Sequence, residues 1–523
     1  MVNFFKRSKN EKNVYESIKK EFTLDDSLIY PGELLKIASE KFANKIALIC
    51  EDKQITYKEF YFRAVKLSEK LKETGIKPRD KVVLYAGNSI EFYIAYFAIW
   101  QIGAVLVPVN IFLHEKELLY VIDNSESTAI FVSNEFKSKI EKLQDNEEFK
   151  NIKTILTEDD IDWKSEVTDN QLFETISLES NELCVLLYTS GTTGKPKGVM
   201  LSAKNVMTNT LQCYARLMST DKAKEESFFS VLPLFHVFAQ NTCLWLPVLT
   251  GSRAIVIKKI DRKLILKGLE NKPTLFLGFP ALFGLLAMMK TAPLDSIRLF
   301  ISGADAMPDK IRMAFGLVYG RKICAGYGLT EAAPVIAVNH ENESLATQLV
   351  GYPIQDLECD IRDENGKSLK QDQIGTLWVK GDNVMMGYYK SPESTQEVLK
   401  DGWLNTGDLG SMNKKGYLAI SGRSKDLIIH KGFNIYPQEI ENVLLSHSAV
   451  YQAAVIGLQD ASVGQIPVAY VGVKGDNLDL EKKLRDLCSE NLAGYKIPKK
   501  IICLEQLPMN ATGKIDKKKL NLF

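Results

Sequence analysis

Cysteine and histidine are scarce in this chain and follow no metal-binding pattern. The 523 residues include 8 cysteines, none of them in a Cys-x-x-Cys pair, and 5 histidines. Most of the cysteines lie in apolar segments, where they are typical of small core residues. The sequence therefore indicates neither a zinc site nor a disulfide framework.

A strong charge bias and long apolar runs are also absent. The formal net charge is +1 and the basic residues are dispersed, so the electrostatic footprint of a nucleic-acid-binding protein is missing. The apolar stretches 92–109 and 275–289 are interrupted by Gly and Pro, and they fall short of, or barely reach, the roughly 20 residues of a membrane span. The N-terminal stretch MVNFFKRSKNEKNVYESIKKEF has no apolar region of signal-peptide length. We expect a cytoplasmic protein without a transmembrane segment, and a peripheral contact with a membrane stays open.

Short apolar runs alternate with helical patterns over most of the first three hundred residues. Runs such as KVVLYAG, LCVLLYT and TLFLGF predict an α/β fold of layered parallel sheets and helices. Beyond Gly351, the segments IGTLWVKG and GYLAISGR predict short antiparallel strands. The last hundred or so residues have the size of a small domain. They are predicted to contain helices beginning at Pro437 and over residues 480–493.

This organisation predicts a large N-terminal domain, 1–422, and a small α+β C-terminal domain, 423–523. The N-terminal domain is expected to include a β-barrel-like subdomain at about 351–422.

The loop YTSGTTGKPKGVM, residues 188–200, concentrates hydroxyl groups, glycines and two lysines. It fits neither Walker A, because Pro196 stands where that pattern needs Gly, nor the dinucleotide fingerprint, because its glycines fall at 191, 194 and 198. A flexible surface linker is one interpretation. Hydroxyls, glycine N–H groups and ammonium groups together favour a site for an anion that binds and leaves, such as pyrophosphate.

Four further segments concentrate functional residue types. Taken singly, they have structural explanations: Tyr327 as a core aromatic, Asp408 as a turn residue, Arg423 as a surface cation and Lys514 as part of a basic tail. The segments are GYGLTE (326–331), DGWLNTGD (401–408), GRSKDLIIHKGFNIYPQEIE (422–441) and PMNATGKIDKKKL (508–520).

In this order and beside the loop, the segments resemble the acyl-adenylate-forming superfamily. That superfamily includes acyl-CoA synthetases, peptide-synthetase adenylation domains and luciferases, and the resemblance runs from about Pro31 to the C-terminus. It implies a mobile C-terminal domain and a two-step reaction. A carboxylate and Mg-ATP give acyl-adenylate and pyrophosphate, and a thiol then takes the acyl group.

The resemblance assigns the loop to the β- and γ-phosphates that leave as pyrophosphate. Glycine lets the backbone approach a phosphate closely and lets the loop open afterwards. The residues concerned are Thr189, Ser190, Gly191, Thr192, Thr193, Gly194 and Lys197.

The resemblance also implies a nucleotide site. Tyr327 packs on the adenine, Thr330 contacts the α-phosphate, and Glu331 helps to hold Mg²⁺, a hard cation that prefers oxygen ligands. Asp408 accepts both ribose hydroxyls, because an ionised carboxylate offers two acceptor oxygens. Arg423 reaches the same ribose.

By the same resemblance, the C-terminal domain supplies different groups to the two steps. Lys514 places its ammonium on the attacking carboxylate and the α-phosphate, where charge spreads over phosphoryl oxygens. Lys425 lies at the hinge about which the domain rotates. The segment HKGFN then lines the thiol channel, where Gly432 leaves room for a pantetheine arm.

The acid is predicted from a few positions. His236 is expected to be a catalytic and substrate-binding residue. It stands where amino-acid-activating relatives carry an Asp that pairs with the ammonium, so an amino acid is disfavoured. Gly328 stands where acetate-specific relatives carry Trp, and with Gly303 and Ala304 it is expected to leave the acyl pocket open. Apolar walls are expected from Phe235, Phe238, Phe279 and Phe283, which as core aromatics would look the same. We expect a medium- or long-chain fatty acid, with an aryl or short-chain acid as the alternative.

The resemblance implies a pantetheine thiol as acceptor, on CoA or on acyl carrier protein. The segment SGADAMPDKIRMAF is similar to the acyl-acyl-carrier-protein synthetase branch, but both acceptors present the same pantetheine to the channel. Two other classes stay open: a kinase, which would release ADP rather than AMP, and a non-catalytic nucleotide- or acyl-binding relative.

Overall fold

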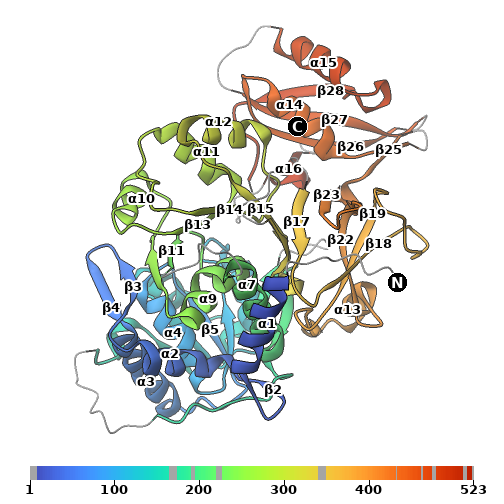
Figure 1. Ribbon diagram of the computed structural model, residues 1–523. Coiled ribbons are helices and arrows are strands. Elements are labelled where there is room, and N and C mark those ends of the chain that lie inside the picture. Colours follow the sequence, from blue (N-terminus) through green and yellow to red (C-terminus); the bar gives the residue numbers. More distant parts are fainter. Residues whose placement is uncertain are drawn as a thin grey trace.

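Two long sheets and a smaller third sheet organise the chain (Figure 1). The structure is a computed structural model, and it describes residues 9–163, 173–189, 195–218, 226–339, 349–430, 433–460, 463–473, 479–509 and 515–520.

The first sheet has the strand order β20-β10-β9-β6-β5-β7-β8. Its middle strands are parallel, whereas β10 runs antiparallel to both β9 and β20. The antiparallel strands β9 and β10 come directly before and after the predicted phosphate loop. Their pairing places the two ends of this loop side by side. The strands are β5 (Lys81–Tyr85), β6 (Val105–Pro108), β7 (Ala129–Val132), β8 (Thr154–Leu156), β9 (Leu183–Thr189), β10 (Lys197–Ser202) and β20 (Gly387–Tyr388).

The second sheet begins with a parallel block of six strands in the order β15-β14-β13-β11-β12-β3, with β4 antiparallel at the edge. Parallel strands were predicted for this part of the chain, and the prediction is confirmed. The strands are β3 (Ile46–Cys50), β4 (Lys53–Thr56), β11 (Ser227–Ser230), β12 (Arg253–Val256), β13 (Leu275–Gly278), β14 (Leu299–Ser302) and β15 (Cys324–Gly328).

Antiparallel strands continue this sheet beyond β15 in the order β16-β17-β23-β22-β19-β18. The strands expected near 351–422 are therefore present, and hydrogen bonds through β16 and β17 make them continuous with the parallel block. They are β16 (Val335–Val338), β17 (Leu349–Pro353), β18 (Glu358–Arg362), β19 (Gly375–Lys380), β22 (Trp403–Met412) and β23 (Leu418–Arg423).

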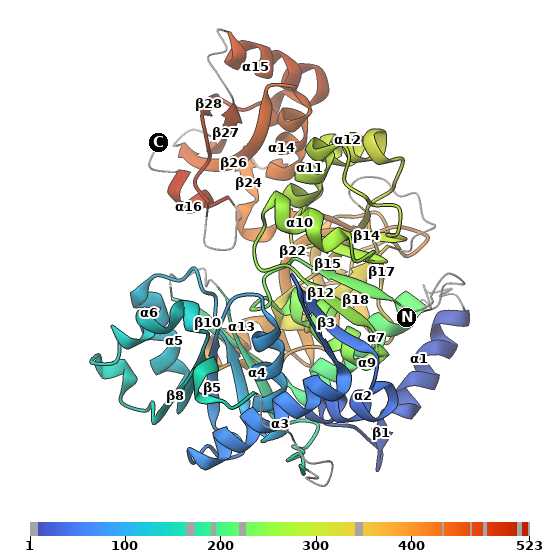
Figure 2. The same ribbon diagram turned by 90° about the vertical axis from the view of Figure 1, so that its left-hand side faces the viewer.

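Helix α4 (Ile90–Gln101) lies between the two long sheets and contacts both β5 and β3 (Figure 2). Every one of its residues except Glu91 is buried, as expected for a helix that is apolar on all sides and enclosed by protein. This placement explains the apolar stretch 92–109. Within the described ranges, no helix has the length and apolar character needed to cross a membrane.

Residues after Ile428 form a third sheet with a core of its own. Figure 1 shows this part above the two long sheets, and the short turn η7 (Ser424–Asp426) leads into it from β23. The helix predicted at Pro437 is α14 (Pro437–Ser446), whereas the helix predicted to reach residue 493 is α15 (Leu480–Asn491) and ends two residues earlier. The strands are β24 (Ile428–His430), β25 (Phe433–Ile435), β26 (Val450–Asp460), β27 (Gly464–Val473) and β28 (Lys500–Leu504).

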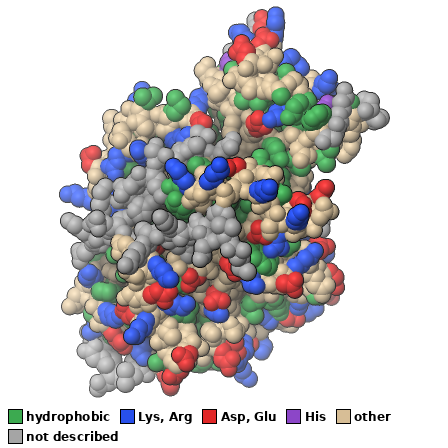
Figure 3. All heavy atoms as spheres, turned by 45° about the vertical axis from the view of Figure 1, so that its right-hand side comes forward, with side chains coloured by type: hydrophobic (Ala, Val, Ile, Leu, Met, Phe, Trp, Pro, Cys, Tyr) green, Lys and Arg blue, Asp and Glu red, His purple; other side chains and the backbone are tan. Residues whose placement is uncertain are grey.

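The surface carries both signs of charge. Figure 3 shows Lys and Arg side chains interspersed with Asp and Glu over the face that it presents. This mixed surface agrees with the formal net charge of +1.

Candidate active site

Tyr327, Asp408 and Arg423 converge from three strands of the second sheet. The Tyr327 hydroxyl donates to Asp408 Oδ2 at 2.6 Å. Asp408 and Arg423 face each other across β22 and β23, with Arg423 Nε 3.6 Å from Asp408 Oδ1. Burial, reinforced by the Asp408 carboxylate, raises the pKa of Tyr327 well above its ordinary value. The tyrosine therefore stays neutral and acts as a donor. The structure brings together these three predicted nucleotide-binding residues.

The turn before Asp408 explains its orientation. Thr406 Oγ1 donates to the carbonyl of Leu377 on β19 and accepts from the backbone N–H of Asp408 at 3.1 Å. Gly407 between them has φ +70°, a conformation that glycine adopts without strain. The Asp408 side chain is only 14 % exposed, so a ligand that reaches it meets a sheltered carboxylate.

Glu331 lies beside this group, in the short turn η6 (Thr330–Ala332) that follows β15. Its Oε1 accepts from the hydroxyl of Tyr388 at 2.8 Å. Burial raises the pKa of Glu331, while Tyr388 and Arg423 lower it and Asp408 raises it. Because both Arg423 and Asp408 act on this carboxylate, the predicted ribose and magnesium residues share one electrostatic neighbourhood.

Buried amides fix the backbone that follows Glu331, and the sequence did not single them out. Asn209 on helix α7 (Ala203–Met218) donates to the Val335 carbonyl at 2.9 Å and accepts from the Val335 N–H at 3.1 Å. Asn241 donates to Asn209 at 3.1 Å, and Asn383 donates to the Ala332 carbonyl at 2.8 Å. Lone asparagines in helices and loops carry no pattern that separates such roles from ordinary surface positions.

Three predicted acyl-pocket residues gather at the carboxyl ends of neighbouring parallel strands, where α/β proteins usually bind their ligands. Gly303 directly follows β14, Ala304 has φ +68°, and Gly328 ends β15. A Cβ on Gly303 would lie 3.1 Å from the ring of Phe238. The space above these strand ends is therefore bounded by the Phe238 ring.

Two expectations about this pocket need revision. A Cβ on Gly328 would lie 2.1 Å from the carbonyl oxygen of Pro334, so Gly328 is needed for close backbone approach, and its lack of a side chain is no measure of pocket size. Phe283 is fully buried in the core against Phe276, Phe300 and Phe315. It is a core residue rather than a pocket wall, because α11 (Pro280–Met289) turns it toward the sheet.

His236 lies at the start of a helical segment, where its carbonyl accepts from the Gln240 N–H at 3.0 Å. Its ring is 4.9 Å from that of Phe235, which in turn lies 6.2 Å from Phe112. His236 therefore lies against one aromatic ring, that of Phe235.

Of the other residues predicted for the site, only some lie within the part of the chain that the structure describes. Thr189 ends β9 and pairs in register with Lys197, the first residue of β10, and Lys425 lies in η7, where burial and the neighbouring Arg423 lower its pKa. The other predicted positions lie outside the described residues: Ser190, Gly191, Thr192, Thr193, Gly194, Gly432 and Lys514.

A cavity of about 570 Å³ lies away from this site, near the amino ends of β11, β12 and β13. Its lining includes Phe22, Phe42, Leu249, Arg253 and Thr274. The predicted pocket residues Gly303 and Gly328 lie at the carboxyl ends of β14 and β15 in the same parallel block, so the cavity lies at the opposite edge of this sheet.

The chain belongs to the AMP-binding enzyme family. The family model described as "AMP-binding enzyme" matches residues 35–389, and the model described as "AMP-binding enzyme C-terminal domain" matches residues 439–514. The chain is similar to long-chain-fatty-acid–CoA ligases of Bacillus subtilis (strain 168), at 32% identity, and of Salmonella typhimurium (strain LT2), at 30% identity. Each alignment covers 93% of both chains.

Solved structures with the same fold carry adenylate-type ligands. One is an anthranilate CoA ligase in complex with anthranoyl-AMP, with a TM-score of 0.87, 25% identity and coverage of 94% of this chain and 96% of that chain. Another is o-succinylbenzoate coenzyme A synthetase from Bacillus subtilis with ATP and magnesium ion, with a TM-score of 0.84, 28% identity and coverage of 94% and 99%.

Proposed function

We propose that this protein is an AMP-forming acid–thiol ligase that activates a medium- or long-chain fatty acid through an acyl-adenylate. The observation that carries the proposal is the convergence of Tyr327, Asp408 and Arg423 beside Glu331 at the carboxyl end of β15. A ribose ligand, an aromatic surface for a base and a carboxylate for a cation are the parts that Mg-ATP requires.

Each residue has a distinct task in the first step. Asp408 accepts the two ribose hydroxyls and Arg423 contacts the same ribose, while the Tyr327 ring packs on the adenine. Thr330 contacts the α-phosphate, and Thr189 and Lys197 lie at the base of the loop that holds the β- and γ-phosphates. Residues at the predicted loop positions 190–194 and Lys514 complete the set through the family resemblance.

Glu331 fits the role of a magnesium ligand. Mg²⁺ is usually held by one or two carboxylates together with substrate phosphates, so no larger protein cluster is needed, and the described residues contain none. When bound with ATP, the ion neutralises charge on the phosphate oxygens. The protein's part is to hold the Glu331 carboxylate in place, which Tyr388 and the η6 turn do.

The choice of a fatty acid rests on the long-chain-fatty-acid–CoA ligases to which the chain is similar and on the aromatic surroundings of His236 and Gly303. An aryl acid is the second candidate. It is favoured by the structural likeness to ligases of anthranilate and o-succinylbenzoate.

The second step transfers the acyl group to a pantetheine thiol. CoA is the acceptor named for the relatives, and holo-acyl carrier protein offers the same thiol on a protein surface. The hinge at Lys425 and the channel residue Gly432 serve this step in the proposal, after rotation of the C-terminal domain.

The test is an assay of purified protein with ATP and a panel of acids that includes palmitate, decanoate, benzoate and acetate. We expect palmitate or decanoate to support exchange of labelled pyrophosphate into ATP, and AMP to be released once a thiol acceptor takes the acyl group. ADP in place of AMP would exclude adenylation, and exchange that requires benzoate would establish the aryl alternative. Adding CoA or holo-acyl carrier protein to the same mixture identifies the acceptor.

A further inference from the structure

Tyr388 is the last residue of β20, and Tyr389 follows it directly. The two tyrosines make the same kinds of contact on opposite sides of the strand. Alternate residues of a strand point to opposite faces, so the two side chains enter different surroundings. Each hydroxyl donates to a glutamate and each ring lies under a lysine ammonium. The chain therefore offers a functional candidate and its matched structural copy side by side.

Tyr388 faces the candidate active site. Its hydroxyl donates to Glu331 Oε1 at 2.8 Å, and the Lys197 ammonium lies 5.1 Å from the centre of its ring. Tyr388 therefore contacts both an acidic and a basic residue of the predicted Mg-ATP site.

Tyr389 makes the same two contacts on the outer side. Its hydroxyl donates to Glu126 Oε2 at 2.8 Å, and the Lys81 ammonium lies 5.2 Å from its ring centre. Glu126 also pairs with Lys390 at 3.0 Å. Hydrogen bonds from Tyr389 and Lys390 lower the pKa of Glu126 to about 2. Lys81 and Lys390 both pair with this outer carboxylate, whereas within the described residues no salt bridge reaches the inner carboxylate of Glu331.

The Tyr388 side chain contacts two opposite charges, the Glu331 carboxylate through its hydroxyl and the Lys197 ammonium through its ring. Within the described ranges, no ion pair joins Lys197 directly to Glu331. A direct pair would leave the ammonium less able to bind phosphate and the carboxylate less able to bind a metal ion. A cation over an aromatic face is held without losing its charge, and a carboxylate that accepts one hydroxyl keeps acceptor capacity.

Several hydrogen bonds fix the backbone of Tyr388 and of Glu331 in place. The Tyr388 N–H donates to Thr395 Oγ1 at 2.9 Å on helix α13 (Pro392–Val398), and the Met385 N–H donates to the Glu331 carbonyl at 2.9 Å. Strand pairing of Tyr388 with Val199 fixes the same segment to β10, close to Lys197. The phosphate-loop strand and the η6 turn are thus connected through one residue.

We propose that Tyr388 is a positioning residue that sets Lys197 and Glu331 at a fixed separation for the phosphates and the magnesium ion of Mg-ATP. The inference rests on the proposed function, which assigns the phosphates to Lys197 and the ion to Glu331. It adds a residue to which neither the loop nor the GYGLTE segment points. Its hydroxyl orients the carboxylate, and its ring holds the ammonium.

The experiment separates the two contacts with two variants. Tyr388→Phe keeps the ring and removes the hydroxyl, so we expect the Mg²⁺ concentration for half-maximal pyrophosphate exchange to rise roughly tenfold, as for loss of a group that orients a metal ligand. The KM for ATP at saturating Mg²⁺ should change little. Tyr388→Leu also releases Lys197, so its KM for ATP should rise as well.

A second readout does not depend on turnover. A ligand that binds only the folded state raises Tm, so wild-type protein should gain more thermal stability from ATP with Mg²⁺ than from ATP with EDTA. In Tyr388→Phe that difference should shrink. The matched control is Tyr389→Phe, which loses the same kind of bond at Glu126 and should keep both the wild-type Mg²⁺ requirement and the wild-type Tm difference.

Glu331→Gln distinguishes failure of this inference from failure of the proposed function. If Glu331→Gln needs far more Mg²⁺ while Tyr388→Phe behaves as wild type, Tyr388 has no positioning role. If Tyr388→Phe and Tyr389→Phe lower Tm equally and leave the Mg²⁺ requirement unchanged, both tyrosines are purely structural. A wild-type Mg²⁺ requirement in Glu331→Gln would instead overturn the assignment of Glu331.

Discussion

Asp408 shows how a single residue acquires its role from its neighbours. The Tyr327 hydroxyl and the Arg423 guanidinium both contact its carboxylate, and its side chain is 14 % exposed. A carboxylate that is held in place by two neighbours and sheltered from water is suited to accept two hydroxyl groups of one ribose. The same contacts make it the residue whose loss should be felt most in nucleotide affinity.

We therefore expect Asp408→Ala to weaken ATP binding. Each hydrogen bond to a charged group contributes about 1.5–3 kcal/mol, so the loss of two should raise the Kd for ATP at least about a hundredfold. Isothermal titration calorimetry measures that Kd. The control is Asp360→Ala, which also removes an aspartate paired with an arginine, Arg362 at 2.7 Å, but on β18. Equal ATP affinity in wild type and Asp408→Ala would exclude Asp408 as the ribose ligand.

Gly328 is constrained by backbone rather than by substrate. A Cβ at this position would lie 2.1 Å from Pro334 O and 3.1 Å from Val335 Cα. Neither atom can rotate away, and Asn209 holds Val335 through both of its backbone groups. Even alanine must therefore displace the start of β16.

Gly328→Ala should accordingly destabilise the protein by about 1–3 kcal/mol, the usual cost of overpacking, and lower its Tm in thermal melts. Gly494→Ala is the matched control, because nothing lies within 4 Å of a Cβ there. If Gly328→Ala had the same Tm as wild type, the start of β16 could move aside without a loss of stability.

Sequence patterns identified the predicted residues of the nucleotide site, but they did not identify the neighbouring residues that fix the positions of that site. Tyr327, Asp408, Arg423 and Glu331 were predicted because their segments resemble a family, and the structure brings them together. Tyr388 and Asn209 were missed. A tyrosine in a strand and an asparagine in a helix have common structural explanations, and only the three-dimensional contacts reveal their partners.

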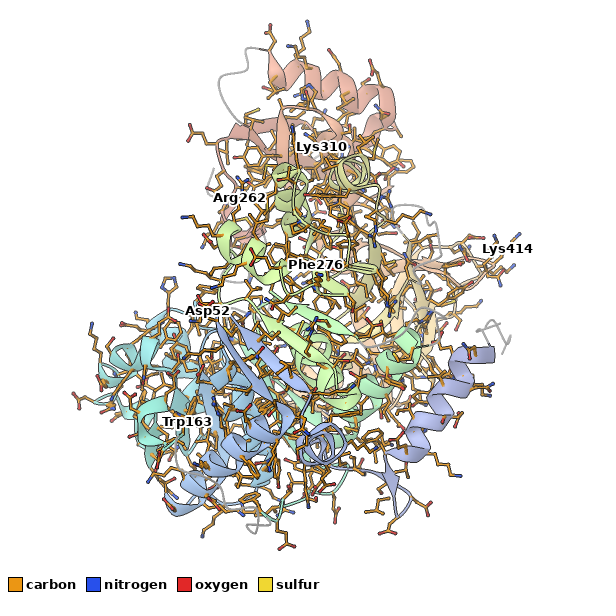
Figure 4. The ribbon with its side chains drawn as sticks, turned by 60° about the vertical axis from the view of Figure 1, so that its left-hand side comes forward. Asp52, Trp163, Arg262, Phe276, Lys310 and Lys414 are labelled. Carbon is orange, nitrogen blue, oxygen red and sulfur yellow. The ribbon has the colours of Figure 1, made fainter. Side chains whose placement is uncertain are left out.

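At the scale of elements, helix α12 (Asp309–Tyr319) connects the second sheet to the C-terminal part of the chain. Lys310 Nζ donates to the carbonyls of His447, Ser448 and Val450 at 3.2, 3.0 and 3.1 Å. Figure 4 shows Lys310 at this boundary. The carbonyls follow the end of α14, where the helix dipole favours a cation. Lys310 thus fastens the C-terminal sheet against α12.

Lys310→Met should loosen this attachment, because the side chain keeps its length and loses all three bonds. We expect faster tryptic cleavage at Arg423 or Lys425 in the connecting turn, measured by mass spectrometry of timed samples. Lys322→Met, which removes an exposed lysine just beyond the end of α12, is the control and should be cleaved at the wild-type rate. Unchanged cleavage in Lys310→Met would show that other contacts hold the boundary.

Helices and strands were predicted well where a single local feature of the sequence determines them. The apolar runs of the first three hundred residues became strands because both faces of a parallel sheet are buried, and Pro437 began α14 because proline suits the first helical turn. The continuity of the antiparallel strands with the parallel block was not predicted. The pairings of β15 with β16 and of β16 with β17 join neighbouring segments, whereas β17 reaches the other antiparallel strands only through the long-range pairing of Leu349 with Ala419 on β23, which no local pattern encodes.

At the scale of the whole molecule, one turn separates two bodies of structure. The second sheet ends at Arg423, η7 spans Ser424–Asp426, and the third sheet begins at Ile428 with its own core. Few local signals in a sequence report how two such parts move. The family resemblance supplies that expectation, with rotation about Lys425 presenting Lys514 for adenylation and the Gly432 segment for thioester formation. The domain limits 1–422 and 423–523 stay predictions on the same basis.

Rotation predicts that the two half-reactions can be impaired separately. Lys514→Ala should lower adenylate formation by about 10²–10³, the cost of losing one transition-state donor, and should spare thioester formation from supplied acyl-adenylate. Gly432→Leu should do the reverse, because a bulky side chain obstructs the thiol channel. Lys425→Pro, which fixes φ at the hinge, should spare pyrophosphate exchange and depress thioester formation.

Both half-reactions are measured on each variant, with thermal melts to establish folding. If Lys514→Ala and Gly432→Leu lower both half-reactions equally in folded protein, a single fixed arrangement serves both steps and the hinge at Lys425 has no catalytic purpose.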